Sequence, residues 1–190
     1  MTNLIHHRMK GKLILLICLF PLFGQSQSKR DSLLLLPELN RQVLDTAIAY
    51  GRLISPTYES AVCTEFVIGV LGHFMNLTTE DTINIRIDQP RESIRDVYRQ
   101  MENDSPYPKG VVYALAVNGK GIEITDRTKV LPGDFVQFWY PNSWGHCGIV
   151  ERIDVENKVL WLHSSYPGTS GYGIQPFHMP EYCHFVRLKR

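Results

Sequence analysis

Two stretches in the first half of the chain place apolar residues three and four positions apart, the spacing that buries one face of a helix. The first is residues 38–53, ELNRQVLDTAIAYGRL, and the second is residues 60–74, SAVCTEFVIGVLGHF. A connection with Pro56 and Tyr58, and with Ser60 as a candidate helix cap, separates them. We therefore predict two helices that pack against each other.

The middle of the chain carries weaker helical patterns. Residues 76–89 alternate isoleucine with polar residues and are predicted to form a loop or a short extended arm. Residues 90–101, PRESIRDVYRQM, predict a helix that begins at a proline, and residues 110–119, GVVYALAVNG, predict a short helix closed by Gly119. The whole region 76–128 is long enough to form a lid or one wall of a groove, or to serve as packing support.

From Val130 onward the apolar period changes to two, which is the period of a half-buried strand. Four strands are predicted there: LPGDFVQFWY (131–140), GHCGIVERIDV (145–155), KVLWLHSS (158–165) and HFVRLKR (184–190). A turn at Glu156 and Asn157 joins the second of these strands to the third. Helices followed by an antiparallel sheet define an α+β fold, in which the helix carrying Cys63 is expected to pack across the sheet.

The N-terminal residues have the layout of a secretory signal. A basic start precedes an apolar run of 11 residues, from Leu13 to Phe23, and a small polar exit. The run is too short for an ordinary membrane span, so residues 1–26 are predicted to be removed, leaving no stable span. An uncleaved N-terminal anchor is the alternative. The rest divides into a spacer, 27–37, and one domain, 38–190, which we expect in the periplasm, the cell envelope or the extracellular space.

The composition excludes some classes of protein. A chain of 190 residues of which 44% are hydrophobic is ordinary for one globular domain. Removal of residues 1–26 takes away three basic residues and leaves 17 Lys and Arg against 19 Asp and Glu. No block of basic residues offers a stripe for phosphate groups, so we expect no nucleic-acid partner.

Cys63 is the candidate nucleophile because it lies on the first turn of a predicted amphipathic helix. Unpaired backbone N–H groups and the positive end of the helix dipole favour a thiolate at that place. His146 and His163 lie in later strand-like runs, and the three residues form a candidate Cys-His-His site. A single such cysteine or histidine is more often structural, so the prediction depends on the combination.

The alternation of side chains along strands predicts how the two histidines are arranged. It places His146, Gly148 and Val150 on one face, so the adjacent Cys147 is expected to point away. With the two strands paired as a hairpin, we expect His146 and His163 to sit opposite each other on one face. A hydrogen bond between them then fixes the tautomer of His146.

Three cysteines remain after removal of the leader: Cys63, Cys147 and Cys183. An odd count fits one free reactive thiol and one disulfide, and Cys147 with Cys183 is the pairing that spares Cys63. Two buried free thiols are the alternative, and the sequence leaves both open.

The chain from about Asn40 to Ser165 resembles the NlpC-type cell-wall peptidase family, a papain-like group of bacterial cysteine hydrolases. VLDTAIAYGRLISPTYESAVCTEFV is similar to that family's helix, tyrosine-bearing turn and cysteine helix. LPGDFVQFW is similar to its Pro-Gly-Asp turn and following strand, and GHCGIV and VLWLHSS are similar to its two histidine strands. The segment VCTEFV is equally similar to the related amidase and endopeptidase domains called CHAP.

The resemblance implies Cys63 as nucleophile, His146 as general base and then acid, and His163 as the residue that orients His146. Tyr58 and Ser164 are secondary candidates, Tyr58 for binding the oxyanion. The implied partners are peptidoglycan stem peptides, commonly cut between γ-D-glutamyl and a diamino acid. No cofactor and no metal are expected.

Other functions stay open at this point. The family that the chain resembles usually has Asp-Cys-Ser-Gly around the nucleophile, whereas this chain has Val62-Cys63-Thr64-Glu65. That difference is compatible with a wall-binding module that has lost catalysis. An acyltransferase would differ only in what accepts the acyl group. A zinc site of Cys63, His146 and His163 has suitable ligand types, but no CxxC or HxxxH spacing supports it.

Overall fold

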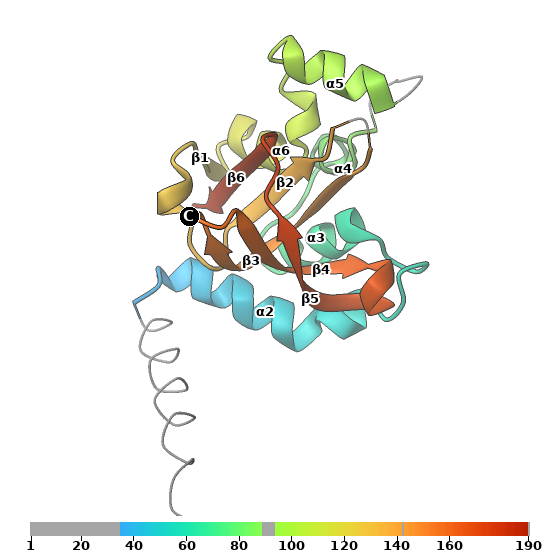
Figure 1. Ribbon diagram of the computed structural model, residues 1–190. Helices are drawn as coiled ribbons and strands as arrows, with labels where there is room; N and C mark the ends of the chain where they lie inside the picture. Colours follow the sequence, from blue (N-terminus) through green and yellow to red (C-terminus); the bar gives the residue numbers. More distant parts are fainter. Residues whose placement is uncertain (1–34, 89–93, 142, 190) are drawn as a thin grey trace, which may run out of the picture. The chain divides into compact units, whose positions relative to one another are not determined.

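Two amphipathic helices begin the described part of the chain. The structure is a computed structural model that describes residues 35–88, 94–141 and 143–189 (Figure 1). The predicted leader, residues 1–26, and most of the predicted spacer lie outside the described residues. Contacts group Leu36–Arg190 into one unit, distinct from the residues before it.

Helices α2 (Glu38–Ile54) and α3 (Cys63–Leu71) confirm the two helices predicted around the nucleophile. They pack against each other, as predicted. A glycine makes the contact close: a Cβ atom on Gly69 would lie 2.5 Å from Cγ2 of Ile54. The absence of a side chain there lets the two helices approach closely.

The segment predicted as a loop or extended arm is a helix instead. Helix α4 (Thr79–Arg86) begins with a capping box in which Thr78 and Asp81 each accept a hydrogen bond from the other's backbone N–H. Helices α5 (Ile94–Glu102) and α6 (Val111–Val117) confirm the other two predicted helices, although the predicted proline start of α5 lies outside the described residues. No helix of the described chain is both long and apolar enough to cross a bilayer.

Within the described residues, six strands form one antiparallel sheet in the order β1-β6-β2-β3-β4-β5 (Figure 1). Their bounds are β1 (Gly121–Ile124), β2 (Phe135–Trp139), β3 (Gly145–Asp154), β4 (Val159–Tyr166), β5 (Gly171–His178) and β6 (Cys183–Leu188). The four predicted strands are confirmed as β2, β3, β4 and β6, whereas β1 and β5 were not predicted. The α+β class is confirmed.

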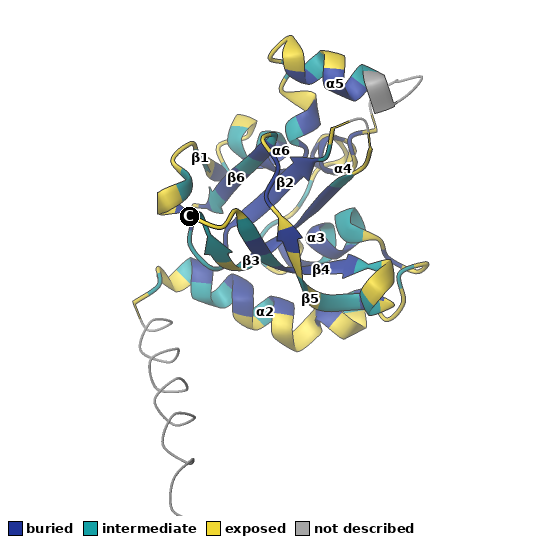
Figure 2. Cartoon of the chain, in the orientation of Figure 1, coloured by how far each residue is buried: buried dark blue, intermediate teal, exposed yellow. Residues whose placement is uncertain are grey.

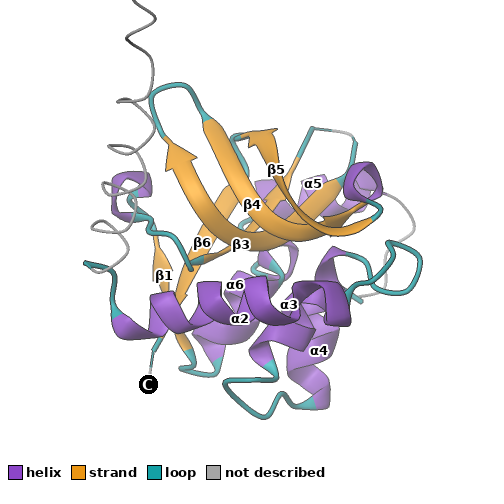
Figure 3. Cartoon of the chain, turned by 90° about the horizontal axis from the view of Figure 1, so that it is seen from below, coloured by secondary structure: helices purple, strands orange, loops and turns teal. Residues whose placement is uncertain are grey.

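Helices α2, α3, α4 and α6 lie on one face of the sheet, and α5 lies apart from them (Figure 3). Helix α3 packs on β3 and β4, α2 packs on β5, and α6 packs on β1, β2 and β6. The central strand β2 is buried along its whole length (Figure 2). The other face of the sheet buries a separate apolar cluster that includes Val136, Phe138 and Val150. The cysteine helix therefore packs across the sheet, as the sequence predicts.

The turn before β2 is tied to α2 and to the last strand by one buried carboxylate. Asp134 is fully buried, and its carboxylate accepts hydrogen bonds from Arg187 Nε and Nη2 (both 2.8 Å), from Asn40 Nδ2 (2.8 Å) and from the Leu131 N–H (2.7 Å). The preceding Gly133 has φ +86°, and a Cβ atom there would lie 2.3 Å from the Asn40 carbonyl oxygen. Only glycine fits this turn without strain.

Candidate active site

Cys63 is the first residue of α3, and it lines a cavity of about 280 Å³ between that helix and the start of β3. The preceding residue, Val62, offers no side-chain hydrogen bond to the helix start. The N–H groups of the first turn therefore have no cap from Val62. The cavity is lined by Tyr58, Val62, Cys63, Thr64, Arg86, Ile87, Gln137, Trp139, Gly145 and His146.

The pKa of the Cys63 thiol is held well below its ordinary value. The largest cause is a hydrogen bond from the Cys147 thiol, and burial of Cys63 opposes it. A hydrogen bond and the charge of His146 lower the pKa further. The first turn of α3 adds the positive end of a helix dipole. Cys63 is thus the thiol of this site that ionises first, while the wholly buried Cys147 keeps its proton.

The expectation that Cys147 points away from the nucleophile is wrong. The predicted alternation along β3 is confirmed, because Val150 belongs to the cluster on the far face. However, the face that carries Cys147 is the one on which α3 packs, so the Cys147 thiol meets the Cys63 thiol. Alternation defines two faces of a strand but does not say which of them a helix covers.

His146 lines the same cavity as Cys63 and interacts with its thiol. Its imidazole is held mainly by aromatic packing, with ring centroids 5.0 Å from Phe177, 5.4 Å from Tyr166 and 5.8 Å from Phe138. Its Nε2 atom is buried and has no hydrogen-bond partner among the described residues. The described site is therefore a Cys-His pair whose imidazole is oriented by aromatic contacts.

His163 does not face His146, and that predicted pairing is wrong. The register pairs His163 with Ile149, which puts His163 on the opposite face of the sheet from His146. Its ring nitrogens lie 2.9 Å from the Tyr172 hydroxyl and 2.9 Å from Glu151 Oε2. A bulge in β3 between Val150 and Arg152 sets this register, and no sequence signal places the bulge.

Replacing His163 with alanine is expected to lower the free energy of unfolding by about 2–4 kcal/mol, because the side chain is fully buried and both nitrogens are bonded. The pH at which Cys63 becomes reactive toward iodoacetamide should stay unchanged. Urea denaturation and alkylation rates measured against pH check the two parts. His163→Gln, which keeps hydrogen-bonding groups, serves if the alanine variant does not fold. A shifted alkylation profile in either variant would show that His163 acts on the site.

The two secondary candidates have different surroundings. Tyr58 lines the cavity, and burial, then the nearby charge of Cys63, raises the pKa of its phenol. A phenol that stays protonated is a hydrogen-bond donor beside the nucleophile. Ser164 is buried and donates its hydroxyl hydrogen bond to the Cys147 carbonyl oxygen (2.7 Å), so it supports β3 and does not line the cavity.

Sequence reasoning missed several residues of the cavity. Gln137 on β2 is buried, and its Oε1 atom has no hydrogen-bond partner among the described residues. Arg86 at the end of α4 lies in the cavity wall and donates from Nε to Glu65 at 2.6 Å. Nothing in the sequence around Gln137 distinguishes it from an ordinary strand residue. Arg86 was missed because α4 itself was not predicted.

A disulfide between Cys147 and Cys183 is excluded by the sheet. Cys63, Cys147 and Cys183 are all free thiols. Across β2, Cys147 pairs with Gln137 and Cys183 pairs with Phe138, so the two cysteines lie on opposite faces and two strands, about 10 Å, apart. A disulfide requires Cα atoms within about 7 Å. The alternative of two buried free thiols is confirmed.

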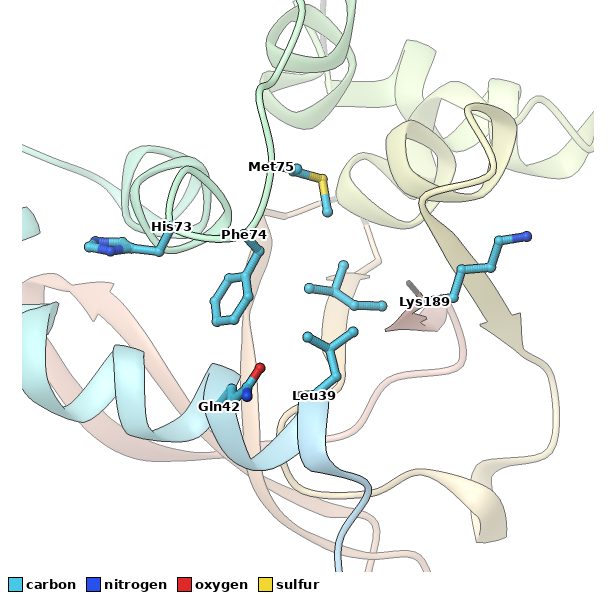
Figure 4. A pocket seen from close by; sticks show the side chains of 7 residues that line it. Leu39, Gln42, His73, Phe74, Met75 and Lys189 are labelled. Carbon is cyan, nitrogen blue, oxygen red and sulfur yellow. The ribbon is translucent and has the colours of Figure 1, made fainter.

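A second cavity, of about 260 Å³, shares no lining residue with the one at Cys63 (Figure 4). It lies among the start of α2, the residues after α3 and the end of β6. No thiol or hydroxyl lines it, so it offers no nucleophile of the kind that Cys63 provides. Its lining residues are Leu39, Gln42, His73, Phe74, Met75, Leu188 and Lys189.

Comparison of this chain with protein families, with curated proteins and with solved structures finds no match. In the described residues, no group of three or more His, Cys, Asp and Glu side chains is placed to hold a metal ion. The polar side chains that line the cavity are a thiol, an imidazole, a phenol, an amide, a guanidinium and a hydroxyl.

Proposed function

We propose that this protein is a cysteine hydrolase with a papain-like arrangement, which cleaves peptide or amide bonds of peptidoglycan. The observation that carries the proposal is the meeting of Cys63 and His146 in one cavity at the start of α3. A thiolate next to an imidazole at a helix N-terminus is the pair that nucleophilic acyl transfer requires.

The mechanism uses Cys63 as the nucleophile and His146 as the acid and then the base. The Cys63 thiolate attacks the amide carbon, and the C=O oxygen becomes an oxyanion near the uncapped N–H groups of α3 and the Tyr58 hydroxyl. His146 gives a proton to the leaving amine and then takes one from the water that releases the acyl group. The buried Gln137 oxygen supports an amide substrate, because a substrate N–H would satisfy that acceptor.

The substrate and the location are proposed from the sequence. The likeness to NlpC-type and CHAP domains supports peptidoglycan stem peptides as the substrate, and the leader-like layout of residues 1–26 supports an exported protein. An exported enzyme meets its substrate outside the cytoplasm, so the two proposals are consistent with each other.

The test is incubation of the protein with purified peptidoglycan, followed by measurement of newly exposed amino groups and of soluble fragments. We expect amino groups to appear, and the rate to persist below the ordinary thiol pKa of about 8.5, because the lowered pKa of Cys63 keeps the thiolate at lower pH. Protein alkylated beforehand with iodoacetamide should be inactive. Equal rates with and without alkylation would contradict the proposal, and fragments bound without cleavage would favour a binding module.

A further inference from the structure

Two free thiols meet at the start of α3. Helix α3 packs on β3, and Cys147 of β3 pairs across the strands with Gln137, which lines the same cavity as Cys63. The Cys147 side chain therefore lies on the face of β3 that α3 covers, and its thiol lowers the pKa of the Cys63 thiol. In the proposed hydrolysis Cys147 only lowers the pKa of Cys63, and it takes no part in a covalent step. Two neighbouring free thiols are also the arrangement from which a disulfide forms.

The two thiols differ in access to the outside. Cys63 is half-buried and lines the open cavity, whereas Cys147 is completely buried behind it. A small oxidant that enters the cavity therefore meets Cys63 first. The third cysteine, Cys183, is buried on the far face of the sheet among Val136 and Phe138, and burial raises the pKa of its thiol to about 12. Cys183 is thus an internal control for thiol reactivity.

We propose that Cys63 and Cys147 form a reversible disulfide when the protein meets a hydroperoxide, with Cys63 as the oxidised thiol and Cys147 as the resolving thiol. This site of modification does not rest on the proposed hydrolysis, since it requires only the two neighbouring sulfur atoms. If the protein is a hydrolase, the disulfide would mask its nucleophile.

The chemistry takes two balanced steps. In the first, the Cys63 thiolate sulfur attacks one oxygen of hydrogen peroxide; an S–O bond forms, the O–O bond breaks, and the departing hydroxide takes a proton to become water. In the second, the Cys147 sulfur attacks the sulfenic sulfur of Cys63; an S–S bond forms and the S–O bond breaks. The hydroxide leaves with the proton of the Cys147 thiol as a second water. Both sulfurs are oxidised and the peroxide is reduced.

The second step has a protective consequence. A sulfenic acid without a partner thiol is oxidised further to sulfinic and sulfonic acids, which ordinary thiol reductants do not reverse. Cys147 lies behind Cys63 on the face of β3 that α3 covers, so we expect it to intercept the sulfenic acid, and its burial keeps it from being oxidised first. The pair therefore converts a permanent loss of the Cys63 thiol into one that a thiol reductant restores.

The experiment treats the folded full chain with hydrogen peroxide, alkylates the remaining thiols after denaturation, and maps the cysteine peptides by mass spectrometry. We expect a peptide pair joined through Cys63 and Cys147, alkylated Cys183, and recovery of both thiols after dithiothreitol. In Cys147→Ala, sulfinic and sulfonic acid at Cys63 should rise by about tenfold over wild type, without recovery. Cys183→Ala is the matched control and should form the same disulfide as wild type.

The proposal would be overturned if wild type formed sulfinic and sulfonic acid at Cys63 as fast as Cys147→Ala does and gave no cross-linked peptide. Cys147→Ser, which keeps the size of the side chain, replaces the alanine variant if that one does not fold. Because the readout is mass, a protein without hydrolytic activity that still forms the disulfide would refute only the proposed function. An active hydrolase that forms no disulfide would refute only this inference.

Discussion

Replacement of Cys63 with alanine is expected to lower the rate of peptidoglycan hydrolysis by about a thousandfold or more, because alanine has no atom that attacks the amide carbon. The fold should survive, since Cys63 is only half-buried at the first position of α3 and alanine is the best helix former. The measurements are release of new amino groups from purified peptidoglycan and a thermal melt of each variant.

Variants of the other two cysteines serve as controls and should differ in their rates of hydrolysis. Cys183→Ala should hydrolyse at the wild-type rate, because Cys183 does not line the cavity that holds Cys63. Cys147→Ala removes the hydrogen bond that contributes most to the low pKa of Cys63, so its rate should fall near neutral pH and recover as the pH rises. A Cys63→Ala variant that still hydrolyses at the wild-type rate would show that the cavity is not the hydrolytic centre.

Most of the fold was predictable because local patterns and the final structure agree. The helical spacing of 38–53 and the period-two alternation after Val130 correspond to α2 and to β2, β3, β4 and β6. The failures have local causes. In α4, a capping box of Thr78 and Asp81 outweighs the isoleucine alternation that indicated an extended arm. Strand β5 is exposed at several positions, so its apolar signal was too weak to recognise.

The candidate site was predictable in part, since Cys63 and His146 do meet in one cavity. The role expected of His163 depended on register, and the β3 bulge moves the pairing so that His163 faces Tyr172 and Glu151 instead. The position of Cys147 was predicted wrongly because tertiary packing decides which face of β3 the helix α3 covers. Local sequence patterns show which side chains alternate along a strand. They do not show where a bulge occurs or which face of the sheet a helix covers.

Replacement of Asp134 with alanine is expected to cost about 3–5 kcal/mol of the free energy of unfolding, because it leaves the Arg187 guanidinium without its buried counter-ion. The side-chain amide of Asn40 and the backbone N–H of Leu131 lose an acceptor as well. Asp134→Asn keeps the shape and should cost less, about 1–3 kcal/mol, because the amide oxygen still accepts hydrogen bonds. Urea denaturation measures both values.

An exposed ion pair provides the comparison for that loss. Lys129 and Asp126 lie 3.5 Å apart with their side chains largely in solvent, so Lys129→Ala should cause no measurable change in stability. Arg187→Ala should lower the free energy of unfolding nearly as much as Asp134→Ala, because it leaves the fully buried Asp134 carboxylate without its counter-ion. Equal small losses in all of these variants would show that the buried pair does not hold α2 to β2 and β6, and that the cavity at Cys63 is positioned by other contacts.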